Sequence, residues 1–388
     1  MRRARSAAMA AGVMLVFAAG CTSATPPARE ETPAPAPVPV VEEAAPTVEE
    51  AAPVATPAVV AVAGGIYAVC VAVDDGRVRC LGSDGGEGWP TAPAAIFGEG
   101  ERRPVELAMS DTELCARRAD GSVACRGKYG RDSEPLAGVG VAATAIDAGM
   151  DHGCAALADG GVACWGHNER GQLGDGTKEN RWEAVRVVGV DDATGLALGW
   201  DHSCALREGG GVACWGANEL GQLGLRGKGK VKEKRRPSAV PGITDAVAIT
   251  SGMRAKQTCA LRRGGAVSCW GAWGMDSEIA PRRLGADPVE LPPAAGVVEL
   301  AVNTWRICGR TADGAALCWD AVDDDEEHTG ESVYAATAPL FPGAKTTSLT
   351  SSAFSMQGVQ EDMSVRIEGD TSRGMDDVAR VEPFAPAP

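Results

Sequence analysis

Cysteine spacing is the feature that most restricts what this chain can fold into. Of its 13 cysteines, all but Cys21 fall into six pairs, and the two members of every pair are ten residues apart. The pairs are Cys70 and Cys80, Cys115 and Cys125, Cys154 and Cys164, Cys204 and Cys214, Cys259 and Cys269, and Cys308 and Cys318. An even number of regularly spaced cysteines in an exported protein implies a disulfide framework. One local unit therefore recurs six times.

Each pair encloses the signal for a tight β-hairpin. A glycine always stands six residues after the first cysteine, preceded by turn-forming residues such as Asp74 and Asp75 before Gly76. This pattern is typical of a three-residue loop in which a type I turn is followed by a left-handed glycine. Counting outward from the loop places the two cysteines directly opposite on antiparallel strands, with Cα atoms about 4.5 Å apart, which is within disulfide reach. We therefore predict one disulfide in each hairpin.

Zinc binding is the alternative use of these twelve thiols, as sites of four thiolates each. Zinc ligands in ribbons and fingers usually come as two cysteines separated by only a few residues. The chain has no pair with such close spacing. We therefore favour disulfides and expect neither a metal site nor a cofactor.

The hairpins recur with a long period. The first cysteines of successive pairs are 39 to 55 residues apart, which matches propeller blades of four strands each. Residues 146–157 closely parallel residues 196–206, and both segments contain Asp-His-x-Cys-Ala. Residues 164–174 and 214–224 both read Cys-Trp-Gly-x-Asn-Glu-x-Gly-Gln-Leu-Gly. These two blades are nearly superimposable in sequence.

These motifs resemble the regulator-of-chromosome-condensation (RCC) repeat family, in which an Ala-x-Gly-x-x-His-x-x-Ala-Leu strand precedes Trp-Gly-x-Asn-x-x-Gly-Gln-Leu-Gly. The resemblance covers residues 58–380 and implies an all-β fold, a seven-bladed β-propeller. Residues 348–354 leading to 364–369 have the same shape as the six hairpins, and Ile367 lies about one period after Cys318. We interpret them as a seventh blade without a disulfide. The Gly-Gln-Leu-Gly element is absent from the first, second, fifth and sixth blades, so no binding surface can be transferred from known members.

The resemblance also implies structural roles for side chains of the motif. His152 and His202 are expected to form hydrogen bonds at the equivalent place in their blades. Four tryptophans are expected to pack between blades: Trp165, Trp215, Trp270 and Trp319. Asp201, His202 and Ser203 have the residue types of a catalytic triad, but consecutive strand residues point to opposite faces and cannot converge. No nucleophile elbow, P-loop or His-Glu-x-x-His motif occurs, and we predict that the protein is not an enzyme.

The N-terminus predicts export. Three arginines precede an apolar run over residues 7–19, which is too short to span a bilayer but long enough for the core of a signal peptide. The end of this run, residues 17–21, resembles the lipobox of bacterial lipoproteins, with Ala18 where that family usually has Leu. The resemblance implies lipid attachment at Cys21 and a place in the bacterial cell envelope, at the outer membrane or cell surface. Ordinary signal cleavage that leaves Cys21 as a free thiol is the alternative.

Composition divides the chain into four parts. Residues 1–20 form the lipoprotein signal peptide, and residues 21–57 are rich in Pro, Ala and Glu, a composition typical of a disordered, extended tether. The propeller occupies residues 58–380, and residues 381–388 form a disordered tail. The net charge of −15 argues against general nucleic-acid binding, which needs clustered Lys and Arg.

Two charged runs interrupt the repeats. The basic run lies in the longest interval between hairpins, and we predict an inserted, exposed loop. Its charged members are Arg226, Lys228, Lys230, Lys232, Lys234, Arg235 and Arg236. A solvated insertion is the interpretation that we favour, and docking of an acidic partner or an anionic envelope polymer is the alternative. The acidic run at residues 323–327 lacks the ligand pattern of an EF-hand calcium loop, and we expect a solvated loop.

The function that we favour is a lipid-anchored, non-catalytic scaffold. It would be a monomer that presents loops on one face of a rigid ring to a protein or an envelope polysaccharide. One alternative is an inhibitor of an exported enzyme, because a secreted β-lactamase-inhibiting protein is known with this family's propeller. A second is an envelope enzyme that degrades polysaccharide with a pair of loop carboxylates. Nucleotide exchange, as in the family's namesake, conflicts with export.

Overall fold

In the computed structural model of the chain, almost all of the regular secondary structure is β-strand. The structure describes residues 57–381 apart from residues 67, 83–93, 128–131, 133–134, 226–230, 274–281, 293–295, 323–332, 337–338, 353–354 and 370–378. The predictions for the signal peptide, for the tether up to residue 56, for Cys21 and for residues 382–388 lie outside the described residues. Within the described ranges, no helix is long and apolar enough to cross a bilayer.

The described strands form seven antiparallel sheets, which we number as blades in chain order. Blades 1 and 2 have three strands each: β1 (Val59–Gly64), β2 (Ala68–Val73), β3 (Val78–Gly82), and β4 (Pro104–Met109), β5 (Glu113–Arg118), β6 (Val123–Gly127). A short 3-10 helix, η1 (Gly100–Arg102), precedes blade 2. Blades 3 and 4 have four strands each: β7 (Ala143–Ala148), β8 (His152–Leu157), β9 (Val162–Gly166), β10 (Arg181–Arg186), and β11 (Ala193–Leu198), β12 (His202–Arg207), β13 (Val212–Ala217), β14 (Glu233–Ala239).

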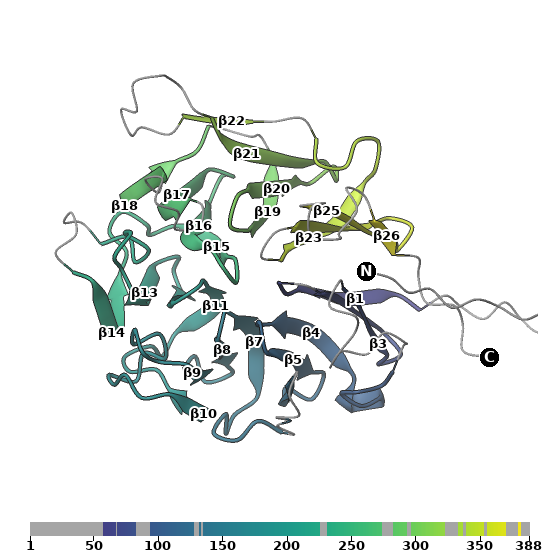
Figure 1. Cartoon of the computed structure of the whole chain (residues 1–388), viewed down its shortest axis with the longest axis horizontal. Coiled ribbons are helices and arrows are strands. Elements are labelled where there is room, and N and C mark those ends of the chain that lie inside the picture. The colour runs from purple at the N-terminus through teal and green to yellow at the C-terminus, as the bar shows by residue number, and fades with distance from the viewer. Residues whose placement is uncertain are drawn as a thin grey trace, which may run out of the picture. The chain divides into compact units, whose positions relative to one another are not determined.

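Blades 5 to 7 also have four strands each. They consist of β15 (Ala246–Ser251), β16 (Lys256–Arg262), β17 (Val267–Trp273), β18 (Arg282–Glu290); β19 (Val297–Val302), β20 (Ile307–Thr311), β21 (Ala316–Val322), β22 (Val333–Ala336); and β23 (Thr346–Ser351), β24 (Ser355–Gln360), β25 (Val365–Gly369), β26 (Ala379–Val381). Figure 1 shows the blades arranged around a common centre, with the first strand of each blade innermost. The predicted seven-bladed propeller is confirmed.

The six predicted cysteine pairs are disulfides, each between the second and third strands of its blade. In every pair the two cysteines are directly opposite in the strand register, and their Cα atoms are 4.0 to 4.1 Å apart. The predicted pairing is therefore confirmed in all six hairpins. The bonds join Cys70 to Cys80, Cys115 to Cys125, Cys154 to Cys164, Cys204 to Cys214, Cys259 to Cys269, and Cys308 to Cys318.

The hairpin turn sets this register. In every disulfide-linked hairpin the glycine six residues after the first cysteine has a positive φ of 80° to 93°. Its N–H donates to the carbonyl three residues earlier, over 2.8 to 3.0 Å. The left-handed glycine therefore closes the turn that brings the two sulfur atoms together.

Blade 7 repeats this hairpin without cysteines. Met363 takes the glycine's place with φ of 64°, and its N–H donates to the Gln360 carbonyl over 2.9 Å. The two positions that hold cysteines in the other blades hold Gln357 and Ile367, which are directly opposite each other. Both side chains are buried. The interpretation of residues 348–369 as a seventh blade without a disulfide is confirmed.

The ring closes by packing between the first and last blades. The first described strand, β1, is the inner strand of blade 1, and the last, β26, is the outer strand of blade 7, so neither completes the other blade. Valines of blade 1, including Val69 and Val71, form one apolar cluster with Val359, Val365 and Ile367 of blade 7. Burial of apolar side chains thus holds the two ends of the ring together.

The tryptophans of the motif lie in the core between blades, as expected. Trp165, Trp215, Trp270 and Trp319 are at most 3% exposed. The indole N–H of Trp215 donates to the Gln172 carbonyl over 2.7 Å, and that of Trp270 donates to the Gln222 carbonyl over 2.9 Å. Each of these two rings therefore ties its own blade to the loop of the preceding blade.

Candidate binding face

The connections of the propeller fall into two groups at opposite ends of the ring. Because the strands of a blade alternate in direction, the first-to-second and third-to-fourth connections share one end. The His167 N–H donates to the Asp151 carbonyl over 2.9 Å, and the Ala217 N–H donates to the Asp201 carbonyl over 2.8 Å, so the two kinds of connection are in contact. We call this end the loop face. The other end carries the short disulfide-linked hairpin turns, and we call it the turn face.

The Trp-Gly-x-Asn-x-x-Gly-Gln-Leu-Gly motif shapes the third-to-fourth connections of blades 3 and 4. Asn168 Oδ1 accepts a hydrogen bond from the Leu173 N–H over 3.0 Å, and Gln172 Oε1 accepts one from the Arg170 N–H over 2.9 Å. Blade 4 repeats both contacts at the equivalent positions. The amide side chains satisfy backbone donors inside the loop, so their role is structural.

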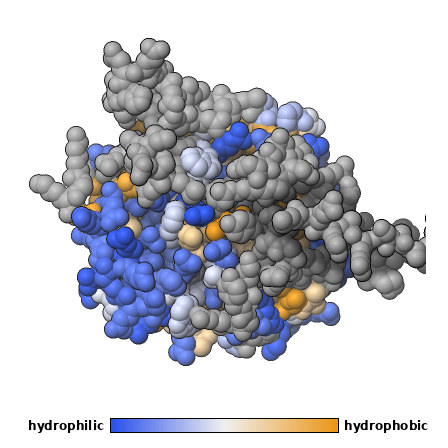
Figure 2. Space-filling model, viewed as in Figure 1, coloured by the Kyte–Doolittle hydropathy of each residue, from blue (hydrophilic) through white to orange (hydrophobic). Residues whose placement is uncertain are grey.

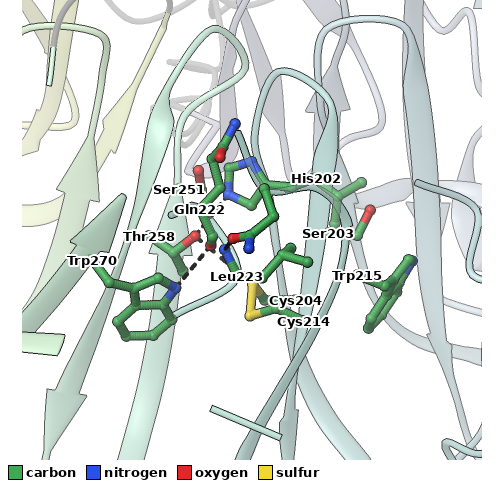
Figure 3. The surroundings of a disulfide bond; sticks show 12 residues. His202, Ser203, Cys204, Cys214, Trp215, Gln222, Leu223, Ser251, Thr258 and Trp270 are labelled. Atoms are coloured by element: carbon green, nitrogen blue, oxygen red, sulfur yellow. Dashed lines mark hydrogen bonds between the residues drawn. A yellow bond between two sulfur atoms is a disulfide. The ribbon is translucent and has the colours of Figure 1, made fainter. Parts of the chain in front are cut away.

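The two histidines bridge neighbouring blades, which confirms their expected structural role. His152 Nε2 lies 2.8 Å from Ser203 Oγ. His202 Nε2 lies 2.8 Å from Thr258 Oγ1, and Figure 3 shows these two side chains together. Complete burial lowers the pKa of each imidazole to about 3. In both rings Nδ1 has no hydrogen-bond partner within the described part of the chain. At neutral pH both side chains are therefore uncharged groups within the interface between blades.

Asp201, His202 and Ser203 do not converge. Ser203 Oγ donates to the Gln172 carbonyl over 2.8 Å, whereas His202 reaches the opposite neighbour, Thr258. Ser203 does contact His152, but both side chains are almost completely buried. A substrate could not reach this hydroxyl without separating the blades.

A cavity of about 340 Å³ runs between the inner strands at the centre of the ring. Its wall includes two carboxylates, Glu106 and Asp147. Burial raises the pKa of Asp147 to about 7, although the N–H groups of Leu198 and Ala148 donate to its carboxylate. Burial also raises the pKa of Glu106, against the opposing effect of an Arg117 guanidinium at 2.7 Å. Both carboxylates accept backbone hydrogen bonds from the next blade, so they act as links between blades.

Apolar side chains pack together at the loop-face end of this cavity. Ile66, Met150 and Met253 come from the first-to-second connections of blades 1, 3 and 5, and they pack against one another. Glycines allow these connections to approach so closely: a Cβ added to Gly149 would lie 2.3 Å from the Gly199 carbonyl oxygen. The centre of the loop face is thus an apolar plug surrounded by tightly packed backbone.

Aromatic and charged side chains surround the plug. The Trp200 ring has the Arg254 guanidinium at 4.9 Å and the Lys256 ammonium at 4.8 Å from its centroid. Trp305, in the equivalent connection of blade 6, is 48% exposed. Next to it, Arg306 forms an ion pair of 2.8 Å with Glu368 of blade 7. This composition, with aromatic rings and arginines together, is typical of protein interfaces.

The basic run is only partly within the described residues, and the prediction that it is an inserted loop is wrong for residues 233–236. Residues 233–239 form β14, the outer strand of blade 4, in which Lys234 is paired with Gly216. Charged side chains are common on edge strands because they discourage pairing with other chains. That is why a strand could be mistaken for a loop here. Arg226, Lys228 and Lys230 lie outside the described residues, as does the acidic run at 323–327.

The strand β14 also packs against blade 3. Its Arg235 carbonyl accepts a hydrogen bond from the Gly176 N–H over 3.0 Å, and its Glu233 forms an ion pair of 2.7 Å with Lys178. Figure 2 shows hydrophilic side chains gathered over the part of the ring where Figure 1 places β10 and β14. The described members of the basic run therefore belong to a polar rim next to the loop of blade 3; they are Lys232, Lys234, Arg235 and Arg236.

A surface pocket of about 340 Å³ lies between blades 2 and 3 at the loop face. We call it the blade 2–3 pocket. Its lining among the described residues is Ser110, Thr112, Glu113, Gly127, Asp151, Gly166, His167 and Trp182. Trp182 is 54% exposed, and its ring meets that of His167 edge to face at 5.8 Å.

Sequence reasoning missed this pocket. The one available signal was Trp182, a tryptophan outside the repeating Cys-Trp-Gly position. Its equivalent in blade 4 is Arg235. The residues just before these two, Arg181 and Lys234, are each paired with the glycine of the Cys-Trp-Gly segment in their own blade. The other lining residues come from two blades, and only the packing of those blades brings them together.

Comparison with known proteins agrees with this architecture. Two models of the regulator of chromosome condensation (RCC1) repeat match the chain, one at residues 143–172 and 193–222 and the other at residues 159–206. The chain is an RCC-repeat β-propeller. The matched residues belong to blades 3 and 4, the two blades with the complete motif. No curated protein matches the sequence.

Solved structures extend the likeness of this RCC-repeat propeller to most of the ring. Human WBSCR16 superposes with a TM-score of 0.62 at 16% identity, over 76% of this chain and 84% of that chain. Prp20p from Saccharomyces cerevisiae superposes with a TM-score of 0.59 at 17% identity, over 85% of this chain and 88% of that chain. The ectodomain of the receptor kinase ACR4 from Arabidopsis thaliana superposes with a TM-score of 0.51 at 16% identity, over 85% of this chain and 99% of that chain. At such identities the likeness concerns the fold alone.

Proposed function

We propose that this RCC-repeat propeller is a lipid-anchored, extracytoplasmic scaffold that binds a protein partner through its loop face and catalyses no reaction. Six disulfides support an oxidising compartment, because such bonds rarely persist in the reducing cytosol. The signal-like N-terminus and the lipobox-like residues before Cys21 support the anchor.

The observation that carries the proposal is the position of the exposed aromatic side chains. Among the described residues, the large apolar side chains with marked exposure include two aromatic ones, Trp182 and Trp305. Both lie at the loop face, one at the start of β10 and the other in the connection between β19 and β20. Tryptophan is enriched among the residues that contribute most to protein binding. The loop face is therefore the surface that we assign to the partner.

Structural neighbours offer a precedent for protein binding on this fold. Prp20p is described with its binding properties to Gsp1p and histones, and yeast RCC1 (Prp20) has also been crystallised with Kap60 bound to it. These partners belong to the neighbours. The precedent supports the class of function, a binding scaffold, and leaves the partner of this chain to experiment.

Crosslinking of the full-length protein in its own intact envelope tests the scaffold. We expect one abundant protein to be captured by the unaltered chain and to be lost with the double variant Trp182→Ala/Trp305→Ala. The matched control is Val188→Ala, because Val188 is similarly exposed at 41% but lies in a connection on the turn face. Equal capture by both variants, or capture of polysaccharide in place of protein, would overturn the proposal.

The basic rim is tested as a separate arm of this experiment. Neutralising Lys232, Lys234, Arg235 and Arg236 together weakens capture if the basic run docks the partner. Retained capture assigns these residues to the solvated edge of β14. For the anchor, labelled fatty acid should follow Cys21, and the Cys21→Ala protein should leave the membrane fraction. A Cys21→Ala protein that stays membrane-bound would refute the anchor.

A further inference from the structure

The connection between β19 and β20 in blade 6 is a turn fixed from within. Asn303 Oδ1 accepts hydrogen bonds from the Trp305 N–H over 2.8 Å and from the Arg306 N–H over 2.7 Å. The Asn303 N–H donates to the Arg306 carbonyl over 2.9 Å. Asparagine commonly fixes turns in this way, by accepting from the backbone that follows it. Asn303 is itself buried, so its side chain supports the turn from inside and is not available to a partner.

Both neighbouring blades hold this turn in place. From blade 5, Gln257 Nε2 donates to the Asn303 carbonyl over 2.8 Å. Gly252, also of blade 5, packs so closely that an added Cβ would lie 2.3 Å from the Val302 carbonyl oxygen. From blade 7, Ser351 Oγ donates to the same Val302 carbonyl over 2.6 Å. The backbone of the turn is therefore ordered before any partner binds.

This ordered turn presents the Trp305 side chain to solvent. Trp305 is 48% exposed. Within the described part of the chain, its ring makes no aromatic or cation-π contact and its indole N–H donates no hydrogen bond. The other tryptophans of the loop face differ, because the Trp182 ring contacts His167 and the Trp200 ring lies next to two cations. The Trp305 indole thus has no such role within the ring itself.

The centre of the loop face does not admit a side chain of a partner. Ile66 and Met253 are buried there and pack with Met150 in the apolar plug. A segment of a partner could enter the central cavity from this face only by displacing these side chains. Contact at the loop face therefore requires the partner to receive a side chain of the propeller, and Trp305 is placed to be inserted.

We propose that Trp305 is the anchor residue of the interface, and that the partner protein receives its ring in an apolar pocket with one hydrogen-bond acceptor for the indole N–H. This inference rests on the proposed function and names the residue and the kind of partner surface that meet. Tryptophan is prominent among residues that dominate binding, and its N–H usually has an acceptor when it is buried. A loop that is already ordered also loses less conformational freedom on binding.

A polysaccharide fits this position less well. A sugar bound on an aromatic ring also needs placed polar groups that fix its orientation. The neighbours of Trp305 are not arranged for this, because Asn303 and Thr304 are buried and Arg306 forms an ion pair with Glu368. The described surroundings of the indole therefore favour an apolar pocket on a protein.

Photocrosslinking from single positions of the full-length protein, in its own intact envelope, tests the contact. The photoreactive residue p-benzoylphenylalanine replaces Trp305 in one sample and Val188, on the turn face, in the control. We expect position 305 to capture the same protein that chemical crosslinking captures, with the bond formed to apolar residues of that protein. We expect position 188 to capture nothing above background.

Binding of the purified partner separates the anchor from its support. Trp305→Ala should raise the Kd by about 30-fold, and Trp305→Phe, which keeps an apolar ring but lacks the N–H, should give an intermediate Kd. Asn303→Ala should raise the Kd by about threefold, because the turn is then less ordered before binding. Asn303→Asp, which keeps an acceptor at Oδ1, should bind like the unaltered protein. Thermal unfolding of each variant checks that the ring remains folded.

Asn303 is a positioning residue in this proposal, so its effect has to depend on the tryptophan. In the Trp305→Ala background, Asn303→Ala should cause no further loss of affinity. An effect of the same size with and without Trp305 would show that Asn303 acts on the ring as a whole, and the anchor assignment would be overturned.

The outcomes distinguish this proposal from the scaffold on which it rests. If chemical crosslinking captures no protein, the scaffold proposal fails, and the anchor fails with it. If a protein is captured that position 305 does not contact, the scaffold stands and the anchor assignment is wrong. A crosslink from position 305 to polysaccharide would also overturn the assignment.

Discussion

Blade 7 offers a quantitative test of the hairpin register. We predict that the double variant Gln357→Cys/Ile367→Cys forms a seventh disulfide, because these residues face each other as Cys70 and Cys80 do in blade 1. Closing a loop of this size restricts the unfolded chain and contributes about 3 kcal/mol. Replacing buried Ile367 removes apolar contacts at a cost of about 1 to 2 kcal/mol. Replacing Gln357 removes the hydrogen bond that its Nε2 donates to Ser355 Oγ, but it also removes an Oε1 that is buried without a partner among the described residues, and we take these two effects to offset each other.

The expected net gain in the free energy of unfolding is therefore about 1 to 2 kcal/mol over the unaltered protein. It is larger still over the matched control Gln357→Ser/Ile367→Ser, which has the same losses without the bond. Urea unfolding measures the difference. Thiol alkylation and mass spectrometry of the denatured, unreduced protein measure the bond itself. Two additional alkylated thiols in the double cysteine variant would show that these residues are not opposite each other, and the register argument would fail.

Close backbone approach, buried histidines and the disulfides each supply a further prediction. Gly199→Ala should lower the free energy of unfolding by about 2 kcal/mol or more, because the added Cβ would lie 2.8 Å from the Ala255 carbonyl oxygen and 2.1 Å from the His202 ring. Thermal unfolding checks this against the control Gly195→Ala, whose Cβ has ordinary contacts at 3.6 Å, and equal effects of the two variants would contradict the prediction. Burial lowers the pKa of His152 and His202 to about 3, so below about pH 6.5 the unfolded chain binds more protons than the folded protein. The free energy of unfolding should therefore fall as the pH is lowered from about 6.5 to 3, by up to about 1.4 kcal/mol per pH unit for each histidine. Urea unfolding at several pH values should show a shallower fall for His202→Gln, and an identical slope would refute the assignment. Denatured but unreduced protein should show none of the twelve paired thiols in a thiol titration, and many reactive thiols would disprove the disulfide framework.

The candidate site was less accessible to sequence reasoning than the fold. The basic run was singled out by its charge, yet its residues 233–236 form an edge strand, because composition alone does not distinguish a charged loop from a charged edge strand. The pocket residues are ordinary members of their own repeats. Asp151 of blade 3 is equivalent to Asp201 of blade 4. Asp151 differs in its environment, because it shares a pocket with Trp182 and Glu113.

The sequence by itself determined the features that depend on short separations along the chain. Ten-residue cysteine spacing with a glycine at the sixth position sets the hairpin register, and therefore the disulfides, through local turn geometry. The long repeat then determines how many such hairpins stack into a ring. Even the blade without cysteines was recognisable, because Ile367 stands at the expected period.

Only the tertiary structure decided what depends on the meeting of different blades. The burial of His152 and His202 between blades, the apolar plug at the loop face and the position of the Asp151 carboxylate in a pocket are properties of interfaces. Burial and the approach of charges from separate repeats depend on distances in space. A repeat motif contains the same residue types in each copy, so it does not indicate which residues of other blades contact each copy.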